Sequence, residues 1–215
     1  MRTAPEGRWF ITLAWVIALA LIAAAARSGR PTWWIAAAVW TILAVWVVAF
    51  FRDPERAWTR GDNLLIAPAD GKVVSVLEID EPAFLGDRAV RVSIFMNVFD
   101  CHVNRYPADG TVSYRHYNPG EFGHAGVEKA SLKNEQASIG LVTSHGRVLI
   151  RQIAGLVARR IVTDHQVGAA VRQGERMGMI RFGSRVDLFL PLGARVLVQP
   201  GAATRVGVTV VAQWS

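Results

Sequence analysis

Residues Met179 to Pro191 read MIRFGSRVDLFLP and place a Gly-Ser pair, Gly183-Ser184, between two strand-like apolar runs. Glycine and serine are common in turns, so the pair can simply connect two strands. The serine hydroxyl is also a potential nucleophile. In a hydrolase it needs a histidine base, and the FGSRV string lacks the flanking pattern of a nucleophile elbow. Alternatively, it attacks the preceding carbonyl, which glycine leaves open because it has no Cβ.

His102 lies in FDCHVNRYPADG, where a strand-like pattern gives way to polar residues. Asp100, Asn104 and Arg105 are its neighbours in the sequence, so polar side chains gather at the end of a hydrophobic strand. We therefore take His102 as the histidine that stands out as a catalytic candidate. His124, in the glycine-rich GEFGHAG, receives no catalytic role.

Asp70 is a second candidate and lies in IAPADGKV. Asp-Gly after Pro-Ala is typical of a hairpin turn, and the same PADG string recurs at Asp109-Gly110, so the sequence leaves its role open. No two histidines have the spacing of metal ligands, and Cys101 is the only cysteine. We expect no metal site and no internal disulfide.

Short strands must position these residues, because after RDPERAW the chain changes to alternating apolar runs separated by Gly, Pro, Asp and Asn. The runs are rich in Val and Ile and recur about every ten residues, which predicts a mainly β fold, a compact β-barrel or sandwich of the barrel-sandwich kind. The expected strands are Lys72–Ile79, Val90–Asn97, Gly110–Tyr117, Ser138–Thr143, Arg147–Ala154, Arg159–Val162, Met177–Phe182, Val186–Leu190, Arg195–Val198 and Val206–Val211.

Two uncharged apolar runs precede this region, at about 9–26 and 32–51, and RSGRP separates them. Each is about long enough to cross a bilayer as a helix. We expect an N-terminal hydrophobic helical hairpin over residues 1–56 and a β-rich catalytic domain over 57–215. The hairpin either spans the membrane or lies in one leaflet. Arginines outside the two helices outnumber those in the loop, which favours a cytoplasmic location for the main domain.

The chain carries a formal net charge of +7. Hydrophobic residues make up 52% of it, and the excess over an ordinary soluble domain is concentrated before residue 52. A basic chain suits anionic lipid, an acidic substrate or nucleic acid. No helix-turn-helix, RNP-like or zinc-finger pattern is present, so we expect no nucleic-acid partner.

Several strings, in this order and at this spacing, resemble phosphatidylserine decarboxylases, specifically the short membrane-anchored form. The resemblance covers nearly the whole chain after residue 50. The strings are FFRDPER, APADGKV, FDCHVNRYPADG, GEFGHAGVEKASLKNEQ, RQIAGLVARRIV and GERMGMIRFGSRVDLFLP.

The resemblance implies self-cleavage between Gly183 and Ser184. Ser184 attacks the Gly183 carbonyl, and a covalent pyruvoyl group then forms from Ser184. The products are a β chain, 1–183, and an α chain, 184–215, which stay together as a heterodimer because we expect the two strands beside the cut to share one sheet. The pyruvoyl ketone forms a Schiff base with phosphatidylserine and accepts the electrons left by CO2, which yields phosphatidylethanolamine.

Residue roles are carried over by position. Asp70 matches the acid of the self-processing site, and His102 matches the acid–base histidine. Asn104 and Arg105 are candidates for substrate binding or support. Arg105 stands where the longer form has a second histidine, so the Asp–His–Ser cleavage triad stays open. Either His102 serves both steps, or Arg105 polarises the Gly183 carbonyl while another base acts.

The partners implied are phosphatidylserine, an anionic membrane surface and a possible homo-oligomer, at the cell membrane with the catalytic domain on the cytoplasmic face. Two other functions fit the sequence. One is a pyruvoyl decarboxylase acting on a related amino-lipid. The other is a non-catalytic membrane-tethered β-domain, an adaptor or lipid-binding module.

Overall fold

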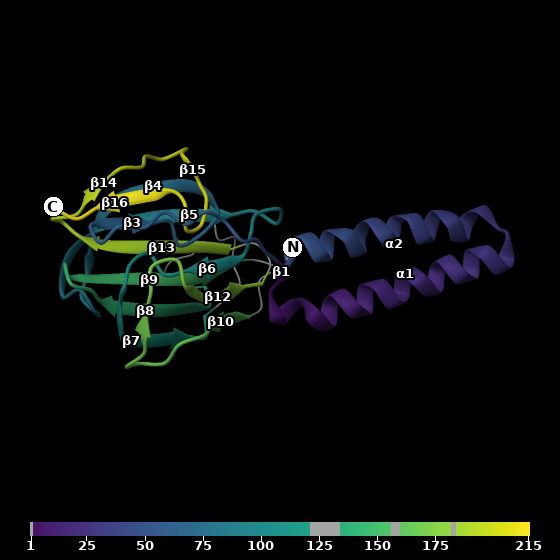
Figure 1. The fold of residues 1–215 in the computed structure, drawn as a ribbon, viewed down its shortest axis with the longest axis horizontal. Coiled ribbons are helices and arrows are strands. Elements are labelled where there is room, and N and C mark those ends of the chain that lie inside the picture. Colours follow the sequence, from purple (N-terminus) through teal and green to yellow (C-terminus); the bar gives the residue numbers. More distant parts are fainter. Residues whose placement is uncertain (1, 121–133, 156–159, 182–183) are drawn as a thin grey trace. The chain divides into compact units, whose positions relative to one another are not determined.

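The computed structural model describes residues 2–120, 134–155, 160–181 and 184–215. They form two compact units, Met1–Glu55 and Arg56–Ser215. The first is helical and the second consists of β-sheet, so the predicted mainly β fold with an N-terminal apolar helical hairpin is confirmed (Figure 1).

The helical unit contains α1 (Arg8–Ser28) and α2 (Pro31–Phe50), preceded by a short 3-10 helix, η1 (Pro5–Gly7). Gly29 adopts the left-handed conformation that ends α1, and a proline begins α2, so the connection is tight. Strands β1 (Arg2–Thr3) and β2 (Arg52–Asp53) pair and bring both ends of the hairpin together.

Both helices are long and apolar enough to cross a membrane by length and composition. Where they contact each other, the buried residues are mostly alanines, which allow two helices to approach closely. Large apolar side chains such as Trp9, Ile35 and Ile42 point outward. The residues exposed on this unit are therefore those that lipid would solvate, which suggests that the chain associates with a membrane.

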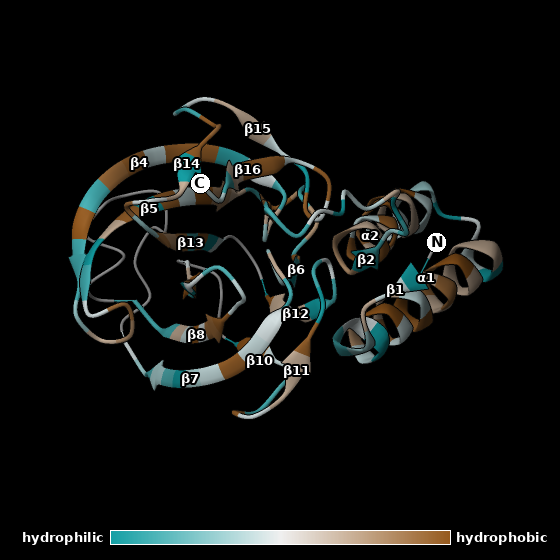
Figure 2. Cartoon of the chain, turned by 60° about the vertical axis from the view of Figure 1, so that its left-hand side comes forward, coloured by the Kyte–Doolittle hydropathy of each residue, from teal (hydrophilic) through white to brown (hydrophobic). Residues whose placement is uncertain are grey.

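An eight-stranded antiparallel sheet is the largest element of the second unit within the described residues, and it curls around the core (Figure 2). In order across the sheet, its strands are β11 (Ala170–Val171), β7 (Gly110–Asn118), β8 (Gln136–Val142), β9 (Arg147–Ala154), β13 (Ser184–Pro191), β5 (Asp87–Met96), β4 (Gly71–Glu81) and β15 (Ala203–Thr204).

Two three-stranded sheets complete the described part of this unit. The first contains β10 (Ile161–Thr163), β12 (Arg176–Ile180) and β6 (Val103–Arg105), and the second contains β14 (Arg195–Val196), β16 (Val210–Gln213) and β3 (Leu64–Ile66). The main apolar core contains residues from all three sheets.

Strand β13 lies in the middle of the eight-stranded sheet, paired with β5 on one side and β9 on the other. Its side chains alternate between two buried faces. Val186 and Leu188 belong to the main core, whereas Arg185 and Asp187 form a buried ion pair on the opposite face. Because Ser184 precedes Arg185, its side chain shares the face of Val186.

All the expected strands overlap observed ones, but the bounds of one of them are substantially wrong. Over Val206–Thr209 the expected strand is wrong, because these residues form a turn. Gly207 has φ = 73°, and a Cβ there would lie 2.3 Å from the Trp58 ring, so a close approach of Trp58 fixes the turn. The expectation that the strands beside the cut share one sheet is also wrong. β12 pairs with β10 and β6, whereas β13 belongs to the eight-stranded sheet.

Candidate active site

Ser184 is the first residue of β13, where it lies opposite Met96 of β5 and Ala154 of β9. Its side chain is fully buried, and its hydroxyl has no hydrogen-bond partner among the described residues. A buried hydroxyl without a partner destabilises a fold, so such a group calls for a functional explanation. Gly183, the other half of the predicted cleavage site, lies outside the described residues, as does His124.

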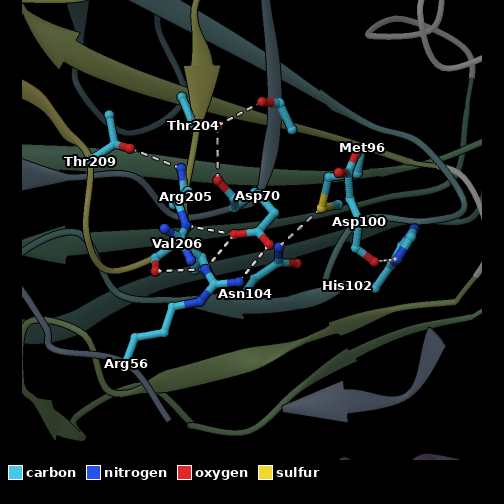
Figure 3. A network of polar contacts seen from close by, with 12 residues as sticks. Arg56, Asp70, Met96, Asp100, His102, Asn104, Thr204, Arg205, Val206 and Thr209 are labelled. Atoms are coloured by element: carbon cyan, nitrogen blue, oxygen red, sulfur yellow. Dashed lines mark hydrogen bonds and ion pairs between the residues drawn. The ribbon is translucent and has the colours of Figure 1, made fainter. Parts of the chain in front are cut away.

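His102 is fully buried between β5 and β6. Its Nδ1 lies 3.0 Å from the backbone oxygen of Asp100 (Figure 3). A carbonyl oxygen only accepts, so Nδ1 donates, and in the neutral ring Nε2 is then the basic nitrogen. The His102 carbonyl accepts a hydrogen bond from the Ile180 amide, which joins this segment to the end of β12.

Asn104 lies on β6 and is fully buried. Its Nδ2 lies 3.7 Å from the sulfur of Met96, as Figure 3 shows, and its Oδ1 accepts a hydrogen bond of 2.8 Å from Nε2 of Gln152 on β9. Met96 is the direct neighbour of Ser184 across the sheet. The amide of Asn104 therefore connects the two strands that flank Ser184.

Asp70 forms a buried ion pair with Arg56. Both carboxylate oxygens accept from the guanidinium, at 2.6 and 2.7 Å, and one also accepts from the backbone amide of Val206 at 2.7 Å (Figure 3). The Asp70-Gly71 bend joins β3 and β4, which lie in different sheets, so it is not a hairpin turn. A Cβ at Gly71 would lie 2.1 Å from the Phe95 oxygen, which explains the glycine.

The sheet register places Asp70 and Ser184 at the same end of the fold. Lys72 of β4 and Arg185 of β13 pair with Phe95 from opposite sides of β5. Because neighbouring strands are about 4.8 Å apart, β4 and β13 are separated by about 10 Å. The structure thus brings Asp70 near Ser184 without placing their side chains in contact, and any action of one on the other needs an intervening group.

Arg105 directs its guanidinium to other partners. It donates to the Gly174 oxygen at 3.0 Å, and its Cζ lies 4.4 Å from the centre of the Trp58 ring. It alternates with Asn104 along β6, so the two side chains leave opposite faces of the strand. The expectation that Arg105 polarises the Gly183 carbonyl stays untested, because Gly183 lies outside the described residues.

Tyr106 and Tyr117 are poor candidates for the base that removes the Ser184 hydroxyl proton. Burial, followed by the charges of Asp164 and Glu175, raises the pKa of Tyr106 far above its ordinary value. The hydrogen bond that Tyr117 donates to Glu135 is the main cause of its raised pKa. Both phenols therefore stay protonated at neutral pH.

Two residues of the site were missed by sequence reasoning. Gln152 lies within a strand that was predicted correctly, but one glutamine in an apolar run gives no signal of its partner. Arg56 was counted only among the positive charges after the second helix. Its pairing with Asp70 spans fourteen residues and strand β3, and only the structure reveals it.

Asp70→Ala, tested in a Ser184→Ala background to prevent cleavage, is expected to lower the free energy of unfolding by about 3–5 kcal/mol, because it removes the carboxylate that pairs with the largely buried Arg56 guanidinium. Near-ultraviolet circular dichroism during denaturant unfolding measures this loss. The control is Glu78→Ala, which breaks the exposed pair with Arg88 and should cost no more than about 1 kcal/mol. Equal losses in the two variants would contradict the structural role of the Asp70 ion pair.

Comparison with known proteins gives a consistent result. Residues 43–212 match the family model described as phosphatidylserine decarboxylase. The phosphatidylserine decarboxylase proenzyme of Symbiobacterium thermophilum is 50% identical over 179 residues, 83% of each chain. The proenzyme of Rickettsia typhi is 46% identical over 177 residues, 80% of this chain and 77% of its own. That of Magnetococcus marinus is 45% identical over 190 residues, 87% of both. The region matched by the family model contains every candidate residue described above.

Proposed function

The chain belongs to the phosphatidylserine decarboxylase family, and from this premise we propose that it generates its own catalytic group from Ser184. It is a decarboxylase that converts phosphatidylserine to phosphatidylethanolamine. The observation that best supports the role of Ser184 is its position: a fully buried hydroxyl at the first residue of the central strand, with no hydrogen-bond partner in the described part of the chain.

Self-cleavage begins when the Ser184 hydroxyl oxygen bonds to the carbonyl carbon of Gly183. The peptide C–N bond breaks, so an ester replaces the amide, and the Ser184 nitrogen takes up the proton lost by the hydroxyl. Removal of the proton on Cα then breaks the Cβ–O bond and releases Gly183 as a carboxylate. One water molecule finally displaces the nitrogen as ammonia and leaves a ketone on residue 184. The net reaction consumes one water and releases one ammonia.

The surroundings of Ser184 fit the pyruvoyl group that this sequence of steps yields. The position is flanked by Met96 and Ala154 in a buried site, and the nearby Asn104 amide is a hydrogen-bond donor suited to a ketone oxygen. This group supplies an electron sink for the pair of electrons that remains on the substrate α carbon when CO2 departs.

His102 is our candidate for proton transfer in both stages. Its basic Nε2 suits removal of the Ser184 hydroxyl proton, and the protonated ring can later deliver a proton to the substrate α carbon. Burial keeps bulk water away from the ring. Asn104 supports the reacting group on one side of β6, and Arg105 supports the same strand from the other.

Asp70 supports the processed site by joining the two fragments. Val206 belongs to the α chain, 184–215, whereas Asp70 and Arg56 belong to the β chain, 1–183. The Val206 amide donates to Asp70, and its oxygen accepts from Arg56 at 3.2 Å. The carboxylate therefore contributes to the geometry needed for self-cleavage by holding the later part of the chain in place.

The membrane is the source of the substrate. A diacyl lipid barely leaves the bilayer, so helices apolar enough to cross a membrane keep the enzyme where its substrate is. The net charge of +7 favours an anionic surface. We place the catalytic unit, residues 57–215 of the predicted domain division, on the cytoplasmic face, and we consider homo-oligomers compatible with this arrangement.

Mass analysis of the purified chain tests this proposal. We expect two fragments, 1–183 and 184–215, on a denaturing gel, with the smaller one lighter by one ammonia molecule than the same peptide beginning with serine. Under native conditions the fragments should co-purify, because β13 pairs with β5 and β9 and β16 pairs with β3, all from the larger fragment. An intact chain that fails to release CO2 from phosphatidylserine would instead favour a lipid-binding module.

A further inference from the structure

Gln152 is a buried amide that the proposed chemistry has not yet used. It lies opposite Val186 on β9, with its side chain on the same face as Ser184 and Ala154. The side chain is fully buried. Its Nε2 donates to Oδ1 of Asn104, whereas its Oε1 has no hydrogen-bond partner among the described residues. An apolar side chain would fill this core position without that cost, so packing alone does not explain a glutamine.

The bond from Gln152 determines which way the Asn104 amide faces. An amide has one accepting oxygen and one donating nitrogen. With Oδ1 held by Gln152, Nδ2 must lie on the opposite side, and it contacts the sulfur of Met96 (Figure 3). A thioether is a weak acceptor, so this donor can readily serve a stronger one. Met96 is the cross-strand neighbour of Ser184, so the donor is directed to the side where the nucleophile lies.

We infer that Gln152 is a positioning residue for self-cleavage, an inference that rests on the proposed role of Ser184. When the Ser184 oxygen attacks the carbonyl of residue 183, negative charge develops on the carbonyl oxygen. Nδ2 of Asn104, which Gln152 keeps on the side of Ser184, is the donor that stabilises this developing charge. Without Gln152, the Asn104 amide can rotate and present its own oxygen, which repels the developing charge.

Gln152→Glu tests this role through a pH profile. An ionised glutamate only accepts, so it draws Nδ2 of Asn104 toward itself and away from Ser184. A protonated glutamic acid donates again and restores the original orientation. Removing one donor to a developing oxyanion typically slows a reaction by about 10²–10³-fold. We expect self-cleavage of the variant to be at least about tenfold slower than wild type at high pH and to accelerate as the pH falls.

Other titratable groups also make the rate of self-cleavage depend on pH, but in the opposite direction from Gln152→Glu. At this end of the sheet lie His102 between β5 and β6, Glu135 before β8, and the Asp70–Arg56 pair. Arg151 lies on the opposite face of the sheet. Acid protonates the proposed His102 base and therefore slows wild-type cleavage. Cleavage of Gln152→Glu that becomes faster as the pH falls therefore cannot come from protonation of His102.

The experiment uses the full chain in detergent, purified at high pH and then shifted across a pH series, with cleavage followed on denaturing gels. Gln152→Met, which has no donor, should stay slow at every pH. Thermal unfolding of each substitution in a Ser184→Ala background checks the fold. A Gln152→Glu profile parallel to wild type, or wild-type rates in Gln152→Met, would overturn the inference.

Asn104→Asp provides a second variant if the Gln152 variants do not fold. An ionised aspartate cannot donate to the oxyanion, so its cleavage should likewise be slow at high pH and recover in acid; a profile parallel to wild type would again overturn the inference. Wild-type protein distinguishes failure of the proposed self-cleavage from failure of the role of Gln152. If it stays uncleaved, the proposed function fails. If it is cleaved while the variants match it, only the role of Gln152 fails.

Discussion

Ser184→Ala is expected to remain a single chain of 215 residues and to release no CO2 from phosphatidylserine. Alanine has no hydroxyl, so the Gly183 carbonyl meets no internal nucleophile and no ketone forms. The substitution removes the electron sink itself, so the rate of decarboxylation falls by several orders of magnitude to the uncatalysed background. Enzymes typically accelerate reactions by roughly 10⁶–10¹⁷-fold over that background. Denaturing gels and release of labelled CO2 measure the two effects.

The control for this variant is Ser144→Ala. Ser144 is exposed, in the turn between β8 and β9, and removing its hydroxyl should leave both cleavage and turnover at wild-type levels. Because the Ser184 hydroxyl makes no hydrogen bond within the described residues, its removal should not lower the melting temperature. Decarboxylation by uncleaved Ser184→Ala protein would contradict the mechanism.

His102→Ala is expected to lower CO2 release per mole of cleaved protein by about 10²–10⁴-fold, the usual contribution of a general acid or base. The imidazole is the group that can return a proton to the substrate α carbon, and alanine has no titratable atom. The measurement divides the rate of CO2 release by the amount of the 184–215 fragment, so slower self-cleavage does not distort it.

His145→Ala is the matched control, because His145 lies in the turn between β8 and β9 and contacts Asp62 and Trp214. Its turnover per cleaved chain should equal that of wild type. If His102→Ala reached the same turnover once cleaved, His102 would have no part in decarboxylation.

Much of the fold follows from local patterns. The two apolar runs became α1 and α2 with ends shifted by one or two residues, because a long uncharged segment has few alternatives to a helix. The longer strands were found by alternation of apolar and polar residues. Among the two- and three-residue strands, β10 and β14 overlap expected strands, whereas β1, β2, β3, β6, β11 and β15 were missed, since so few residues give no measurable period.

By itself, the sequence determined the class of fold, the family resemblance and the residues most suited to chemistry, because these depend on residue type and on spacing along the chain. Only the tertiary structure decided which residues contact one another. It paired Asp70 with Arg56 and Val206, placed the strands beside the predicted cleavage site in different sheets, and joined Gln152 to Asn104 next to the strands that flank Ser184. The physical reason is that strand register and sheet curvature bring together residues far apart in the sequence, and no local pattern records which strand will lie beside which.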